Sequence, residues 1–303
     1  YGIHTDLNPL SIFMVKALSA KVNLGDLYDL SEEILSEFEN IRPKNDKEAK
    51  ALLKGAKYYP NAIDKEFGEV ASTKMQDSTL WIPKDEILPK GSDTPSVLGL
   101  FSPKQLAELA ILRKLILRKT TKQKEMRYSL LLAFYNTLSM INLTYHETNS
   151  RKGAAGSYFA FYYRYRLAKI PYFLDTAETF KRKIKRIING KKDFEDSPHF
   201  YNAYFAPLNR VIKDFKGAMI NQRENVEKID SIESKTNGEK IFQADATNLA
   251  EIESESVDFI YTDPPYGAKI PYLDLSTLWN VWLDMPVDSS LKEKECIEKG
   301  SLE

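Results

Sequence analysis

Four consecutive residues, Asp263, Pro264, Pro265 and Tyr266, combine groups that could bind a flat ring bearing an amine. They follow the apolar, β-branched run 257–261, which we predict to be a buried strand. Neither proline can donate to a strand ladder, so the strand must end there. A carboxylate, a backbone carbonyl held in a proline turn and an aromatic face would then meet at the carboxyl end of a strand. Open α/β sheets bind their ligands at that position.

This D-P-P-Y motif after a hydrophobic strand resembles the catalytic motif of S-adenosylmethionine-dependent amino-methyltransferases, which methylate adenine N6 or cytosine N4. The stretch Ile270 to Ser276, followed by Trp279 and by Val281 to Leu283, narrows the resemblance. It is similar to a group of large bacterial and archaeal adenine-specific DNA methylases that carry a long helical insertion. Adenine N6 is the target that the resemblance favours, and cytosine N4 stays open.

The resemblance implies a role for each residue of the motif. Asp263 and the carbonyl of Pro264 would accept hydrogen bonds from the target amine, Tyr266 would stack on a flipped-out base, and Pro265 would stiffen the turn. An exocyclic amine is a weak nucleophile because its lone pair is delocalised into the ring. Acceptors aimed at its protons favour a pyramidal nitrogen, which is catalysis by positioning and preorganised electrostatics. Unstacking the base costs roughly a few kcal/mol, and the aromatic side chain offsets part of that cost.

The N-terminal stretch predicts the end of a strand and the start of a helix. Asn8 is a favourable N-cap and Pro9 a favourable first helical residue. In the resembled family, the acid of a G-x-D-x-N-P stretch binds the ribose hydroxyls of the cofactor, and the next residue packs on the adenine. This implies S-adenosylmethionine binding by Asp6 and Leu7. Gly2 and Asp6 are two positions further apart than the family usually has them, and the residues alone also allow a capped helix with an incidental acid.

The run 240–249 predicts another strand, which ends at Asp245. In the family, this acid accepts from the adenine amine and the next backbone amide meets the ring, which implies cofactor roles for Asp245 and Ala246. The family's glycine-rich cofactor loop should precede the first strand, and no residue stands before Tyr1. We therefore expect a fragment that binds the cofactor weakly or not at all. A micromolar affinity in a calorimetric titration would refute this expectation.

The long stretch between the two predicted strands has mainly helical patterns. Residues 25–56 are charged with helical periodicity, whereas 80–95 contain three prolines and predict extended or loop structure. Ser102 and Pro103 predict the N-cap and first turn of a strong helix. The apolar run 128–145 predicts another helix in the core of a helical domain.

These patterns predict an α/β fold. It is a partial Rossmann-like, doubly wound methyltransferase sheet with a large, mainly α-helical insertion. Residues 1–20 would form the first part of the methyltransferase core, 21–239 the helical insertion that recognises the target, and 240–303 the second part of the core with the D-P-P-Y motif.

Three segments of the predicted insertion could contact nucleic acid. Two are basic, at 113–127 and 179–192, and the third, 158–166, interleaves aromatic residues with arginines. Basic helix faces can neutralise phosphates, and aromatic rings can stack on bases. Solvated helix faces and core aromatics are the alternative interpretation of the same patterns. The candidate nucleic-acid-binding residues are Arg164, Arg166, Lys181, Arg182 and Lys185.

Composition sets further limits. The 303-residue chain has 43 basic and 43 acidic residues, so a DNA-binding protein of this composition must segregate its charge. The single cysteine, Cys296, suits a reducing cytoplasm. It lies in a charged tail, which argues against cytosine C5 methylation, a reaction that needs an active-site thiolate. We find no secretory signal, no run that approaches a membrane span and no predicted metal site.

Other functions fit the same residues. Related motifs methylate bases in RNA, and a protein that kept the fold could bind DNA without catalysis. Enzymes that methylate protein glutamine generally begin the motif with Asn, so Asp263 counts against that substrate. The expected partner is DNA, with a restriction or defence protein as a further partner and no membrane.

Overall fold

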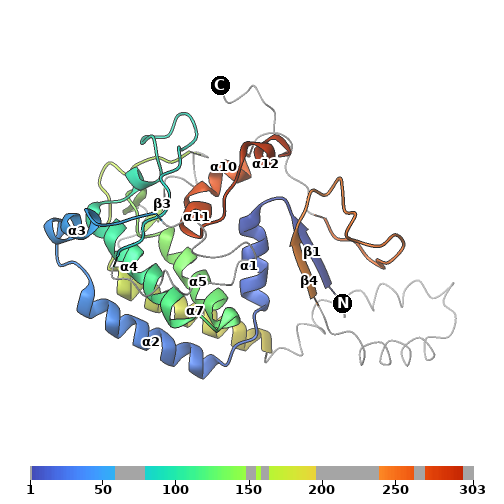
Figure 1. Ribbon diagram of the computed structural model, residues 1–303, viewed down its shortest axis with the longest axis horizontal. Helices are drawn as coiled ribbons and strands as arrows, with labels where there is room; N and C mark the ends of the chain where they lie inside the picture. Colours follow the sequence, from blue (N-terminus) through green and yellow to red (C-terminus); the bar gives the residue numbers. More distant parts are fainter. Residues whose placement is uncertain are drawn as a thin grey trace.

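The computed structural model describes residues 2–58, 79–147, 155–157, 164–195, 239–262 and 270–295. It is a mixed α/β structure in which a body of helices packs beside a small parallel sheet (Figure 1). The predicted combination of helices with a parallel sheet is confirmed at this level.

The sheet consists of β1 (Gly2–Asp6) and β4 (Glu239–Gln243), which run parallel although they are far apart in the sequence. The register pairs Gly2 with Glu239 and Asp6 with Gln243, so both strands end at the same edge. A second, antiparallel pair joins β2 (Tyr145–Glu147) to β3 (Ala155–Ser157). Two of the strands predicted from the sequence therefore form and pair.

The first helix, α1 (Pro9–Ser19), lies between the sheet and the other helices (Figure 1). Asn8 caps it as predicted: its side-chain oxygen accepts from the amide of Leu10 at 3.0 Å, and Pro9 occupies the first turn. Leu10, Phe13 and Ala17 of α1 are buried in the main core. The helix thus joins the strand ends to the helical body.

Among the described residues, five longer helices form most of that body. The predicted helical run 25–56 contains α2 (Leu24–Ile41) and α3 (Asp46–Leu53). A single 3₁₀ turn, η1 (Leu98–Leu100), precedes α4 (Pro103–Lys119), which begins with the expected cap at Ser102. α5 (Lys124–Leu138) and α7 (Thr176–Glu195) pack against each other and against α2.

The helix predicted over 128–145 starts earlier and ends sooner than expected. It is α5, which ends at Leu138, and Tyr145 begins β2 instead. At the helix end, the side-chain nitrogen of Asn142 donates to the carbonyl of Leu138 at 2.6 Å in place of a backbone amide, and its side-chain oxygen accepts from the amide of Thr144 at 2.9 Å. The segment 80–95 contains no helix, as predicted.

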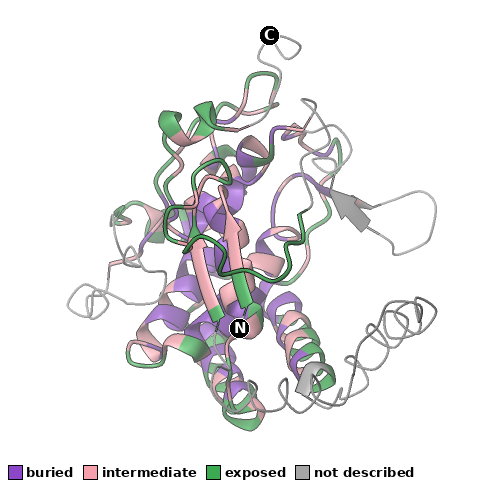
Figure 2. Cartoon of the chain, turned by 90° about the vertical axis from the view of Figure 1, so that its right-hand side faces the viewer, coloured by how far each residue is buried: buried purple, intermediate pink, exposed green. Residues whose placement is uncertain are grey.

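The described range 270–295 contains three short helices: α10 (Tyr272–Leu275), α11 (Thr277–Trp282) and α12 (Ser289–Glu293). Trp282 of α11 is fully buried, with its ring against the edges of Phe101 and Phe134 at 5.5 and 5.8 Å between centroids. The core is therefore shared by α1, the helices of the predicted insertion and α11. Seen from the side of the sheet, the buried residues lie mainly in the helices, and both strands are half-buried or exposed (Figure 2).

Candidate functional site

The carboxyl ends of β1 and β4 bring the two predicted cofactor acids to one edge. The amide of Ala244 donates to the carbonyl of Asp6 at 3.1 Å, and the Gln243 side chain donates to the carbonyl of Leu7 at 2.8 Å. Asp245 follows directly after these contacts. Asp6 and Leu7 therefore lie at the same end of the sheet as Asp245, although more than 230 residues separate them from it in the sequence.

Each of these acids has one oxygen engaged by nearby backbone. The amide of Asn8 donates to Asp6 Oδ1 at 2.7 Å, and Thr247 donates to Asp245 Oδ1 from its amide at 2.9 Å and its hydroxyl at 2.7 Å. In the described residues, Oδ2 of each acid has no protein partner. The bonds from Thr247, with help from the charge of Lys294, hold the pKa of Asp245 below its usual value. An ionised Asp245 can thus accept a hydrogen bond from a ligand.

A hollow of about 340 Å³ opens at this edge. That volume is at the lower end of the range of about 300–1,000 Å³ that is typical of ligand pockets. The sheet contributes Leu7 and the residues at the end of β4, and the C-terminal segment forms the other wall. The lining residues are Leu7, Gln243, Ala244, Asp245, Pro286, Asp288, Ser290, Leu291 and Lys294.

Some of the residues predicted to bind the cofactor line the hollow. Leu7 and Asp245 line it, whereas Asp6 and Ala246 lie near it in sequence but do not. The residues from Pro286 to Lys294, which form the other wall of the hollow, are not predicted from the sequence as part of a site. One signal was available, because Asp288 is a favourable N-cap and does accept from the amide of Leu291 at 2.8 Å.

The motif residues Asp263, Pro264, Pro265 and Tyr266 lie outside the described residues, as does the aromatic part of 158–166 up to residue 163. The motif's position in the sequence is bracketed by 257–262 on one side and 270–283 on the other.

The prediction that 257–261 form a buried strand is wrong. The segment does not form a strand, and the side chains of Phe259, Ile260 and Tyr261 are 80%, 73% and 84% exposed. An apolar run becomes a buried strand only where neighbouring strands and helices cover it. In the described part of the chain, the parallel sheet has only β1 and β4, and neither pairs with this run.

Among the predicted nucleic-acid-binding residues, two lie on an open face of α7. Arg182 and Lys185 are exposed, and Arg186 and Lys192 continue the same face at helical spacing. We call Arg182, Lys185, Arg186 and Lys192 the basic face of α7. The other predicted residue on this helix, Lys181, is half-buried and paired with Glu32 at 2.9 Å.

The two candidate arginines outside α7 make contacts within the protein. The guanidinium of Arg166 pairs with Asp93 at 2.6 Å, and Arg164 donates from Nε to the carbonyl of Lys90 at 3.1 Å. Arg166 is still 43% exposed, which leaves part of it accessible to a ligand.

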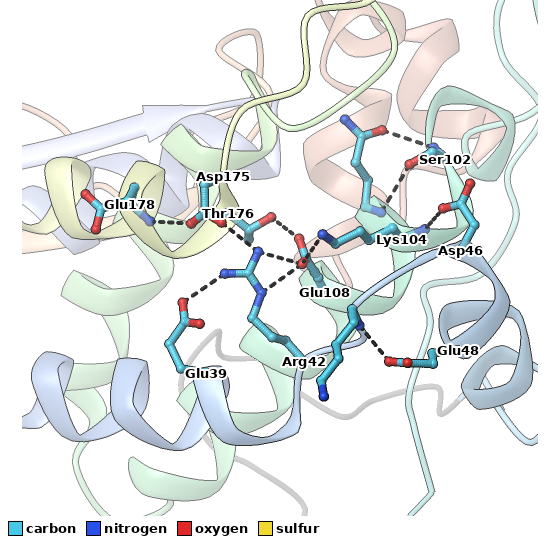
Figure 3. A network of polar contacts seen from close by, with 12 residues as sticks. Glu39, Arg42, Asp46, Glu48, Ser102, Lys104, Glu108, Asp175, Thr176 and Glu178 are labelled. Atoms are coloured by element: carbon cyan, nitrogen blue, oxygen red, sulfur yellow. Dashed lines mark hydrogen bonds and ion pairs between the residues drawn. The ribbon is translucent and has the colours of Figure 1, made fainter.

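A network of ionic contacts fixes the start of α7 (Figure 3). Arg42, at the end of α2, pairs with Glu108 of α4 and with Asp175, both at 2.7 Å. The Thr176 hydroxyl donates to Glu108 at 2.5 Å, and Asp175 accepts from the amide of Glu178 at 3.0 Å. Burial opposes the charge on Arg42, but its two acidic partners outweigh this effect and raise its pKa. The network holds α7 against α2 and α4 and leaves the basic face outward.

The other basic segment, 113–127, does not form an open face. Arg113 and Arg127 are buried, which makes them wrong as phosphate contacts. Lys114 donates to the carbonyl of Thr79 at 2.6 Å, Arg118 pairs with Glu37, and Lys119 pairs with Glu33 at 2.6 Å. These side chains mainly hold helices together.

Comparisons with models of protein families, with curated proteins and with solved structures found no match for this chain. Within the described ranges, no helix is long and apolar enough to cross a membrane. Those ranges also contain no group of three His, Cys, Asp or Glu side chains placed to hold a metal ion. A functional assignment must therefore start from the motifs and from the strand-end site.

Proposed function

We propose that this chain belongs to an S-adenosylmethionine-dependent amino-methyltransferase that modifies a base of DNA, with adenine N6 as the favoured target. One observation carries the proposal. Asp6 and Leu7, assigned to the cofactor from the N-terminal stretch, and Asp245, assigned from the stretch 240–249, lie at the same end of two parallel strands beside a hollow. In this proposal, β1 and β4 belong to a doubly wound, Rossmann-like sheet.

The residues at the hollow fit the adenosyl part of this cofactor. Leu7 and Leu291 offer apolar surface to a flat ring, and Asp245 offers a carboxylate oxygen to an exocyclic amine. The carboxylate of Asp6 would accept from the ribose hydroxyls just outside the lining residues. Ionised acceptors make hydrogen bonds of about twice the strength of neutral ones, so Asp245 would contribute strongly to binding.

The chain's own residues would act on the base by orientation. Asp263 and the carbonyl of Pro264 would hold the two protons of the target amine, while Tyr266 stacks on the ring. When bound, S-adenosylmethionine supplies an electrophilic methyl group. As the new N–C bond forms, the bond from the methyl carbon to the sulfonium sulfur would break and the amine would lose one proton, which Asp263, the acid of the motif, would receive.

The basic face of α7 supports a nucleic-acid substrate. Its four cations project to solvent from a helix that is fixed at its start by Arg42 and Glu108. Each phosphate that they neutralise would release bound counterions, which makes affinity fall steeply with salt. Glu178 and Asp193 are exposed on the same side of α7, so the four cations leave an excess of positive charge on that side of the helix.

Calorimetry with S-adenosylhomocysteine tests the cofactor site. The protein, expressed from its complete reading frame, is compared with Asp245→Ala and with Asp29→Ala, an exposed acid of α2, as matched control. Loss of a charged hydrogen bond costs about 1.5–3 kcal/mol, so Asp245→Ala should weaken binding by about 10- to 100-fold. Equal affinities for all three proteins would contradict the assignment of Asp245.

A further inference from the structure

The segment that follows the D-P-P-Y motif is held in a well-packed position. Residues 271–283 contain α10 and α11, which meet at Ser276, and several of their side chains belong to the main core. Leu273, Ser276 and Asn280 are at most 5% exposed. In the sequence, only three residues separate Tyr266 of the motif from Ile270, where the described segment begins.

Asn8 connects this segment to the cofactor side of the site. Its backbone amide donates to Asp6 Oδ1 at 2.7 Å, and its side-chain oxygen accepts from Leu10 at the start of α1. Its side-chain nitrogen donates to the hydroxyl of Ser276 at 3.2 Å, across 268 positions of sequence. One residue therefore orients the carboxylate of Asp6, caps α1 and reaches the segment behind the motif.

Ser276 uses every hydrogen-bonding position of its hydroxyl. The oxygen accepts from Asn8 and, at 2.9 Å, from the side chain of Asn280, and the hydroxyl donates to the carbonyl of Leu273 at 2.9 Å. A hydroxyl has one donor and two acceptor positions, so the group is saturated. Two of these bonds lie within the segment, and the bond from Asn8 is the one that ties Ser276 to the start of α1.

A second contact fixes the same turn from the side of the predicted insertion. The hydroxyl of the fully buried Tyr165 donates to the carbonyl of Leu275 at 2.8 Å and accepts from the amide of Leu278 at 3.1 Å. The turn around Ser276 is thus held both by α1 and by the tyrosine between Arg164 and Arg166.

We infer that Asn8 and Ser276 are positioning residues for methyl transfer. They set the distance between the cofactor, held at Asp6, and the target amine, held by the motif that precedes Ser276. The inference rests on the proposed function and adds two residues that neither the motif nor the cofactor assignments contain. The physical reason is that transfer between two bound groups depends on their separation, and a misplacement of about 1 Å can cost roughly 100-fold in rate.

Three variants separate positioning from helix capping. Asn8→Ser keeps a capping oxygen for α1, since Ser and Asn are equally good N-caps, but it is too short to reach Ser276. Asn8→Ala removes both the cap and the contact. Ser276→Ala removes the contact from the other side and leaves the cap of α1 intact. The double variant Asn8→Ser with Ser276→Ala completes a cycle that measures coupling between the two residues.

The measurements use the protein from its complete reading frame, labelled S-adenosylmethionine and genomic DNA from a host without DNA methylation. We expect Asn8→Ser and Ser276→Ala each to lower kcat by about tenfold, and the double variant to be no slower than the slower single variant. The dissociation constant for S-adenosylhomocysteine should change less than about twofold. Amide hydrogen exchange of peptides covering 270–283 should become faster in both variants, which reports the loosened segment without reference to activity.

Other results would overturn the inference. A wild-type protein that methylates DNA, together with unchanged kcat in Asn8→Ser, would show that the contact does not position the reaction. A loss of kcat that follows the melting temperature across Asn8→Ser, Asn8→Ala and Ser276→Ala would assign the contact to stability alone. A wild-type protein that neither binds the cofactor nor methylates DNA would refute the proposed function itself, and the inference with it.

Discussion

The two basic segments of this protein have similar compositions and opposite structural roles. Residues 113–127 and 179–192 each carry seven lysines and arginines. In the first segment, Arg113 and Arg127 are buried, and Arg118 and Lys119 pair with acids of α2. In the second, Arg182, Lys185, Arg186 and Lys192 face solvent on one side of α7.

The position of each helix in the fold explains this difference. α4 contacts α2, α3, α5 and α7, so most directions around it meet other helices and its cations find acids or carbonyls there. α7 buries Phe180, Ile184 and Lys191 on one side and leaves the other open. Lys191 donates to three carbonyls at the end of α1, which makes it structural within an otherwise basic stretch. A run of positive charge in a sequence therefore identifies an interface only when its helix has a free side.

The largest expected effect on stability is at the contact of α2, α4 and α7, where a half-buried cation pairs with acids. Arg42→Ala leaves the carboxylate of Glu108, which is 4% exposed, without its main partner. Removing one member of a buried ion pair costs roughly 3–5 kcal/mol, and we expect about 3 kcal/mol here because Thr176 still donates to Glu108. Urea unfolding measures the free energy of unfolding.

Arg182→Ala is the matched control for that experiment. It removes an exposed arginine of α7, so the free energy of unfolding should change by at most about 0.5 kcal/mol. If Arg42→Ala and Arg182→Ala lower the free energy of unfolding by the same amount, the half-buried and the exposed cation do not differ in their contribution to stability.

Charge reversal on the basic face tests its function directly. The triple variant Arg182→Glu, Lys185→Glu, Arg186→Glu should weaken binding to duplex DNA by about 100-fold at low salt and flatten the dependence of affinity on salt. The reason is that three phosphate contacts become repulsions, while these exposed residues contribute little to stability. Fluorescence anisotropy over a salt series measures both quantities.

A control with the same change of net charge uses α3. Lys47, Lys50 and Lys54 are exposed on that helix and its C-cap, away from α7 in sequence. Reversing all three should reduce DNA binding by less than about threefold, through long-range repulsion alone. If both triple variants bind DNA equally, the face of α7 is not the interface.

The smallest expected effect concerns pH. Burial tends to raise the pKa of Asp175, but hydrogen bonds from Arg42 and the amide of Glu178 outweigh it, and the pKa lies below its ordinary value. The pKa of an aspartate in an unfolded chain is about 3.9. The stabilisation is therefore present above that pH and is lost as the pH falls through the lower pKa of the folded state.

Asp175→Asn isolates this contribution. At pH 7 it should lower the free energy of unfolding by at most about 1 kcal/mol, since Asp175 is 44% exposed and solvent screens the pair. The difference between the wild type and the variant should shrink as the pH falls through the lowered pKa of Asp175 in the folded state. A difference that grows towards acid pH would contradict the lowered pKa.

Local chemistry made part of this structure predictable from sequence. Asn8 with Pro9, and Ser102 with Pro103, predict helix starts because capping depends on residues within one turn. The two strands that end near Asp6 and Asp245 also lie close to the positions predicted for them from the sequence. These features need no knowledge of distant contacts.

The predictions that failed depend on neighbours far away in the sequence. The run 257–261 has the composition of a buried strand, but its burial requires partners that its own residues do not specify. The wall of the hollow from Pro286 to Lys294, and the contact between Asn8 and Ser276, arise only when the two ends of the chain meet. Periodicity cannot show such contacts, because it reports one element at a time.

The central claim is that the protein methylates an amino group of a DNA base. Modification-sensitive sequencing of a host that lacks other DNA methylation tests it most directly, with the protein expressed from its complete reading frame as wild type or as Asp263→Ala. We predict N6-methyladenine at one sequence motif with the wild type and none with the variant; N4-methylcytosine would keep the chemistry and change the base. An unmodified genome, from a folded protein that binds the cofactor, would contradict the claim and favour an RNA substrate or a non-catalytic role.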